Sequence, residues 1–75
     1  MRMRVTGEYV SPNGWSHDYT VEDDRHIKFN VRYYSQDHKF PNVSYYHGAN
    51  VPHPSLADSI IEFMENYLAL KESSQ

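Results

Sequence analysis

Hydrophobic and polar residues alternate along the first half of the chain, and the spacing changes to that of a helix near the C-terminus. Alternation over residues 2–10, and again over residues 15–22, has the period of a half-buried β-strand. Between the two segments, Asn13-Gly14 favours positive backbone φ angles and a tight reversal. These segments are therefore predicted to form a β-hairpin.

Two further strands are predicted before the chain changes its pattern. The polar stretch 22–25 indicates a turn, and residues 26–34 then show the clearest alternation in the sequence. A loop that contains Pro41 is predicted over residues 35–42, followed by a short fourth strand over residues 43–47. This fourth strand is expected to lie at an edge of the sheet.

A single amphipathic helix is predicted to close the chain. Residues 48–54 hold one Gly and two Pro and are predicted to be irregular. Apolar residues then recur at helical spacing over residues 56–72. Ser55 is the predicted N-cap, with Asp58 three residues later as in a capping box. The alternative is that Pro54 is the first helical residue.

These elements predict one small α+β domain, residues 1–75, with the order ββββα. The expected architecture is a four-stranded antiparallel meander with the C-terminal helix packed on one face. The sheet residues predicted to face the helix are Met3, Val5, Tyr9, Trp15, Tyr19, Ile27, Phe29 and Val31. Their predicted helix partners are Ile60, Ile61, Met64 and Leu68.

The composition adds that aromatic rings must supply much of this core. Leu, Ile, Val and Phe sum to 15 of 75 residues, which is close to the composition of disordered chains. The formal net charge is only −3, however, and the chain holds 7 Tyr, 3 Phe and 1 Trp. A folded domain of modest stability is therefore expected.

Several kinds of chemistry lack the residues that they need. There is no cysteine, and none of the three glycines forms a phosphate-binding loop. The five histidines lack metal-ligand spacing, and strand alternation places His17 on the face opposite Ser16 and Asp18. We therefore expect a non-enzymatic protein without a metal or cofactor. No apolar run is long enough for a membrane span and no signal peptide is visible, so a cytoplasmic protein is expected.

The uncovered face of the predicted sheet is the better candidate for function. In each of the pairs Tyr33-Tyr34 and Tyr45-Tyr46, one ring must point away from the core. Tyrosine and arginine are enriched at protein interfaces. The residues predicted to bind a protein partner are Arg4, Lys28, Arg32, Tyr34 and Tyr46.

One alternative remains open for the binding surface and two for the partner. Residues 51–75 carry all of the net charge, and Asp58, Glu62 and Glu65 form an acidic helix face that could address a basic partner. The basic sheet face could instead bind single-stranded nucleic acid, although the calculated pI is only about 5.9. An exposed edge strand also makes a homodimer conceivable.

In its size and its sheet-plus-helix architecture, the chain resembles the small inhibitors that phages and mobile elements encode, anti-CRISPR proteins among them. The resemblance implies a protein that occupies a surface of its target, as an inhibitor or adaptor. It rests on architecture, so it assigns no role to any residue.

Overall fold

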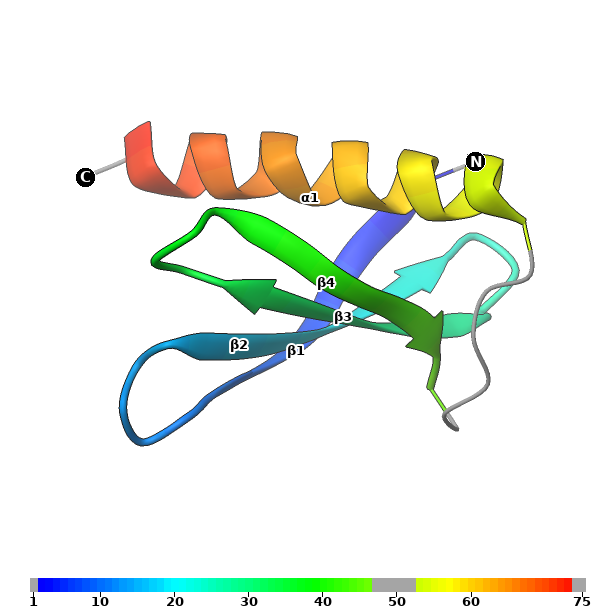
Figure 1. Cartoon of the computed structure of the whole chain (residues 1–75). Coiled ribbons are helices and arrows are strands. Elements are labelled where there is room, and N and C mark those ends of the chain that lie inside the picture. The colour runs from blue at the N-terminus through cyan, green and yellow to red at the C-terminus, as the bar shows by residue number, and fades with distance from the viewer. Residues whose placement is uncertain (1, 47–52, 74–75) are drawn as a thin grey trace.

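The computed structural model describes residues 2–46 and 53–73, which form an antiparallel sheet and one long helix (Figure 1). The strands are β1 (Met3–Val10), β2 (Ser16–Asp23), β3 (Lys28–Tyr34) and β4 (Lys39–Tyr45), and the helix is α1 (Pro54–Ser73). The four strands lie across the sheet in chain order, and each neighbouring pair is antiparallel. The predicted ββββα architecture is therefore confirmed.

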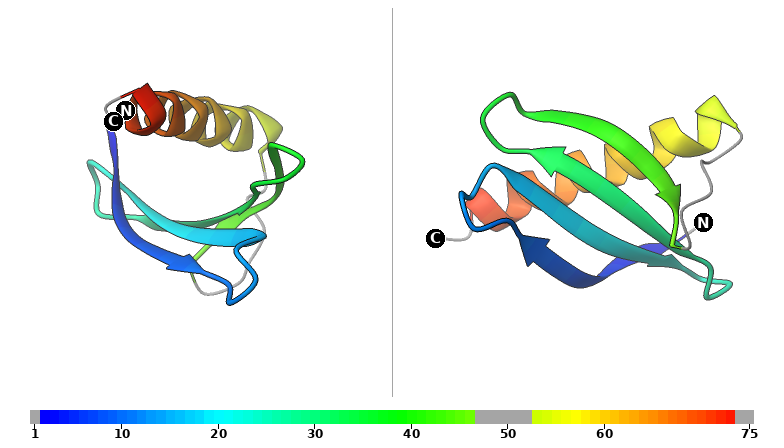
Figure 2. Two further views of the ribbon diagram at one scale, coloured as in Figure 1. Left: turned by 90° about the vertical axis from the view of Figure 1, so that its left-hand side faces the viewer. Right: turned by 60° about the horizontal axis from the view of Figure 1, so that its bottom comes forward.

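The helix lies over one face of the sheet only. Figure 2 shows the sheet twisting and curving beneath α1, while no described element covers the opposite face. We call this uncovered surface the open face. Among the described residues, no helix combines the length and the apolar character that crossing a membrane requires.

The core forms where the sheet meets the helix. Its most deeply buried side chains are Tyr19, Val21, Phe29, Val31, Ile60 and Met64, each at most 1% exposed. Met3, Val5, Ile27 and Leu68 are partly buried and pack against this cluster, as predicted. Aromatic rings contribute to this core as predicted, and the rings of Phe29 and Tyr45 stack with centroids 5.4 Å apart.

The prediction that Tyr9 packs in the core is wrong, because its side chain is 63% exposed. The pairing of β1 with β2 shifts by one residue between Val5 and Gly7, which is a β-bulge. The extra residue reverses the two faces beyond that point. Tyr9 therefore lies on the open face opposite Asp18, and Glu8 takes the position facing the helix.

The prediction that Trp15 packs in the core is also wrong, because its side chain is 56% exposed. It precedes the first paired residue of β2, so strand alternation does not govern it. Its amide donates to Asn13 Oδ1 at 2.9 Å in the turn. The predicted reversal itself is confirmed, since Gly14 has φ +76° and donates to the Ser11 carbonyl at 2.9 Å.

The predicted loop over residues 35–42 is too long, because β4 begins at Lys39 and includes Pro41. β4 lies at the edge of the sheet and its pairing with β3 shifts between Arg32 and Tyr34. Edge strands and bulges are the places where a strand tolerates proline. The predicted strand residue His47 and the irregular stretch 48–52 lie outside the described residues.

At the start of α1 the alternative prediction is the correct one. Pro54 is the first helical residue, and Ser55 is inside the helix rather than at its N-cap. The His53 carbonyl accepts the first two bonds, from Leu56 N at 3.1 Å and Ala57 N at 3.2 Å. Proline suits this position because its missing N–H would have no helical partner there.

Candidate functional site

The strand register arranges the open face into rows of neighbouring side chains. One row holds Arg4, Glu22 and Lys28, the next holds Gly7, Thr20, Asn30 and Ser44, and the third holds Tyr9, Asp18, Arg32 and Asn42. Tyr46 extends the first row, because its amide donates to the Lys28 carbonyl at 3.1 Å. Tyr34 lies beyond the third row, opposite Ser16.

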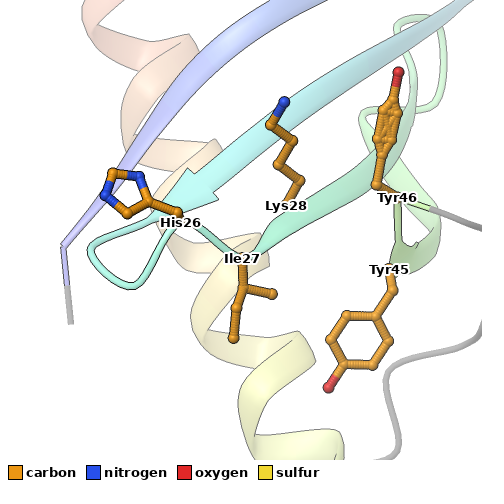
Figure 3. Close-up of a pocket in the computed structure, with 5 residues that line it drawn as sticks. All are labelled: His26, Ile27, Lys28, Tyr45 and Tyr46. Atoms are coloured by element: carbon orange, nitrogen blue, oxygen red, sulfur yellow. The ribbon is translucent and has the colours of Figure 1, made fainter.

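All five residues predicted to bind a partner lie on this face. Figure 3 shows Lys28 and Tyr46 pointing to one side of the sheet, while Ile27 and Tyr45 point toward the helix. The Lys28 ammonium lies 5.8 Å from the centre of the Tyr46 ring, which is a cation–π distance. These residues and His26 line an open hollow of about 510 Å³ at one end of the sheet.

The register also pairs two of the cations with acids. Arg4 forms a hydrogen-bonded ion pair with Glu22, and Arg32 Nε lies 3.1 Å from Asp18 Oδ1. The hydrogen bond from Arg4 lowers the pKa of Glu22, and the hydrogen bond to Asp18 raises the pKa of Arg32. The face that the sequence presented as basic is therefore a mixed surface in which opposite charges meet.

Aromatic rings are the main feature that the open face exposes. Tyr9, Tyr34, Tyr46 and Trp15 are 63%, 37%, 52% and 56% exposed, respectively. The other four tyrosines are buried or packed against the core: Tyr19, Tyr33, Tyr45 and Tyr67. The predicted outward and inward members of both tyrosine pairs are thus confirmed, and three of the seven tyrosines remain for the open face.

Tyr9 and Trp15 belong to this aromatic surface and were missed by strand alternation. Gly7 inside an otherwise regular strand was the available signal for Tyr9, because an internal glycine often indicates a bulge. For Trp15 the signal was its place directly after Asn13-Gly14, where turn geometry replaces alternation.

Trp15 and Tyr34 lie in one hollow of about 390 Å³ at the end of the sheet where two hairpin turns meet. Its other lining residues are Asn13, Ser16, Gln36 and Asp37. The two turns are tied together because Ser35 N donates to the Trp15 carbonyl at 3.0 Å. The Ser35 hydroxyl also donates to the Gly14 carbonyl at 3.0 Å.

A separate polar cluster joins the sheet to the last turns of α1. Glu8 Oε1 lies 3.3 Å from Lys71 Nζ, and Glu8 Oε2 lies 3.6 Å from His17 Nδ1. A hydrogen bond with Tyr19, supported by Lys71 and His17, lowers the pKa of Glu8 although burial raises it. Burial, and then the same Glu8, raises the pKa of Tyr19 well above its ordinary value.

This cluster does not assemble the side chains of a hydrolase triad. His17 lies on the helix side, where its ring is stacked 6.1 Å from that of Tyr19, whereas Asp18 pairs with Arg32 on the open face. Within residues 2–46 and 53–73, no group of three or more His, Cys, Asp or Glu side chains could hold a metal ion.

The predicted acidic surface is exposed on the helix. Asp58, Glu62 and Glu65 all face solvent, on the side of α1 away from the buried residues Ile60 and Met64. This stripe lies on the opposite side of the molecule from the open face, so the two surfaces can be tested independently.

Comparisons of the chain with known protein families, with curated proteins and with solved structures found no match.

Proposed function

We propose that this chain is a non-enzymatic, cytoplasmic protein-binding module that uses its open face to cover a surface of a partner protein. It would act as a small inhibitor or adaptor, because a domain of this size contributes little beyond the surface that it occupies. The observation that carries the proposal is the exposure of Tyr9, Tyr34 and Tyr46 on the open face, with Trp15 exposed in the same hollow as Tyr34.

The chemistry of the open face supports a protein partner. Tyrosine, tryptophan and arginine are the residues most enriched among those that dominate binding energy at protein interfaces. The ion pairs Arg4–Glu22 and Arg32–Asp18 let the face carry charge without leaving those charges unpaired when water is displaced. Such a mixture of rings and paired charges is typical of interface composition.

Single-stranded nucleic acid is a weaker candidate for the same face. Binding a phosphate backbone relies on cations that replace counterions, and two of the predicted cations already pair with carboxylates. This alternative predicts that a single-stranded oligonucleotide is retarded in a gel at low salt and released as salt rises. Failure to retard it at protein concentrations of tens of micromolar would exclude it.

The proposal is tested by quantitative affinity capture with surface variants. The double variant Tyr34→Ala/Tyr46→Ala removes two exposed rings, whereas Asp58→Ala/Glu62→Ala alters the helix face as a matched control. We expect one host protein to be enriched by the wild type and the control and lost from the tyrosine variant. That protein, once purified, should bind the wild type and the helix-face control and should not bind the tyrosine variant.

Two results would contradict this assignment. If the tyrosine variant retains the captured protein while the helix variant loses it, the acidic helix face is the binding surface. If light scattering shows a homodimer that the tyrosine variant dissociates into monomers, a second copy of this chain occupies the open face. Circular dichroism should show that both variants stay folded, since the altered side chains are exposed.

A further inference from the structure

The hollow between Trp15 and Tyr34 is preformed in the chain without a partner. Asn13, Trp15 and Ser16 line it from the first hairpin and Tyr34, Gln36 and Asp37 from the second, and Ser16 and Tyr34 are cross-strand partners. The Trp15 backbone is held on both sides, by Asn13 Oδ1 at its amide and by Ser35 N at its carbonyl. A fixed backbone lowers the entropy cost of binding at the exposed indole.

The groups that line the hollow favour a cation. Two of them, Trp15 and Tyr34, are aromatic, and an indole is the best of the aromatic side chains at attracting a positive charge. Among the described residues that line it, Asp37 is the one carboxylate, and none is a Lys or Arg. Of the nearby cations, Arg32 is paired with Asp18 and also hydrogen-bonds Tyr34, and Lys39 is the cross-strand neighbour of Tyr34; neither cation is among the residues that line the hollow.

We propose that this hollow binds an arginine side chain of the partner protein, stacked on Trp15 and Tyr34 and paired with Asp37. Arginine is favoured over lysine because its planar guanidinium stacks on rings and donates two parallel hydrogen bonds to a carboxylate. The inference rests on the proposed function and specifies the chemistry of the partner.

The chain carries its own reporter for this test, because Trp15 is its only tryptophan. The probes are acetyl-Gly-Gly-Arg-Gly-Gly-amide and the same peptide with citrulline, a neutral analogue of nearly the same shape. We expect the arginine peptide to change Trp15 fluorescence, and the NMR shift of its indole N–H, in a saturable manner. Binding of the citrulline peptide should be about fivefold weaker or more.

Two charge-neutralising variants then locate the contact. Asp37→Asn should weaken binding of the arginine peptide about threefold and leave the citrulline peptide unchanged. Asp24→Asn is the matched control, because Asp24 is equally an exposed acid but lies in the turn between β2 and β3. We expect this control to bind both peptides like the wild type.

The proposal is overturned if both peptides bind equally, if neither shows saturable binding, or if Asp37→Asn binds arginine as the wild type does. These results are distinguishable from failure of the proposed function. If a captured partner is still lost from the Tyr34→Ala/Tyr46→Ala variant, the open face is an interface and only its preference for arginine is wrong.

Discussion

The amide of Ser35 donates a hydrogen bond to the Trp15 carbonyl across 3.0 Å, and this bond joins the ends of two separate hairpins. The Ser35 hydroxyl adds bonds to the carbonyls of Gly14, at 3.0 Å, and Trp15, at 3.3 Å. Ser35, in the turn between β3 and β4, therefore holds the backbone of the turn between β1 and β2, at the point where Trp15 is exposed. We therefore expect the position of the Trp15 ring to depend on that connection.

Replacing Ser35 with alanine tests the connection. Ser35→Ala keeps the backbone bond and removes the hydroxyl, so we expect a loss of about 0.5–1.5 kcal/mol in the free energy of unfolding. Urea denaturation followed by circular dichroism measures it, and the NMR linewidth of the Trp15 indole N–H should report greater mobility.

Ser59→Ala is the control for this substitution. The Ser59 hydroxyl also donates to a carbonyl at 3.0 Å, that of Ser55, but it does so within one helix. Such i to i−4 bonds do not stabilise helices, so we expect an unchanged or slightly higher stability. Equal effects of the two variants would show that the Ser35 hydroxyl does not stabilise the connection between the turns.

The fold could be predicted from the sequence because local patterns and long-range packing agree. The alternation of hydrophobic and polar residues over 28–34 matches the burial of side chains in β3. Phe29, Val31 and Tyr33 are buried, and their neighbours in the strand are not. The helix likewise buries Ile60 and Met64, which are one turn apart. Each of these elements keeps a single period over its whole length.

The candidate site could be predicted only in part, because two bulges interrupt the period. A strand with one extra residue reverses its faces, and the pattern alone does not say which residue is extra. The bulge near Gly7 moved Tyr9 to the open face, and the bulge in β4 placed Lys39 opposite Tyr34. The ion pair Arg32–Asp18 depends on the pairing of β2 with β3, and the sequence pattern alone did not predict which residues of the two strands lie opposite each other.

Two glycines are expected to respond oppositely to alanine. At Gly7 an added Cβ would lie 3.6 Å from Thr20 Oγ1, an ordinary contact, so Gly7→Ala should be tolerated or stabilise by about 0.4–1 kcal/mol. At Gly14 the φ of +76° is unfavourable for alanine, and Gly14→Ala should cost about 1–2 kcal/mol. Urea denaturation of both variants checks this, and a large loss at Gly7 would contradict the bulge geometry.

The packing of α1 on the sheet is tested by two adjacent isoleucines. Ile60 is fully buried, so Ile60→Ala should destabilise the domain by about 2–5 kcal/mol. Ile61 is only half-buried, and Ile61→Ala should cost no more than about half as much. If Ile60→Ala is too unstable to measure, Ile60→Val should still lose about 0.5–1.5 kcal/mol. Similar losses at both positions would mean that the helix is rotated.

Asp23 is expected to make the domain sensitive to acid. Its side chain is buried at the end of β2, where Oδ1 accepts hydrogen bonds from the turn to β3, from Ile27 N and Arg25 N, each at 2.9 Å. Burial alone would raise the pKa of Asp23, but these two hydrogen bonds and the Arg25 guanidinium lower it overall. The folded-state pKa therefore lies below that of the unfolded chain, which is about 3.9.

The sign of the pH dependence follows from that difference. Asp23 contributes stability above its unfolded-state pKa and loses it as the pH falls through its folded-state pKa. Asp23→Asn can still accept both amide bonds but cannot titrate, so it should be less stable at pH 7 and lose less stability on acidification. Denaturation midpoints between about pH 6 and pH 2 measure this, and the exposed Asp24→Asn variant should follow the wild type.

Because Glu8 and Glu22 also have lowered pKa values, Asp23→Asn should keep part of the acid sensitivity. An unchanged acid slope in Asp23→Asn would mean that the buried carboxylate does not stabilise the turn.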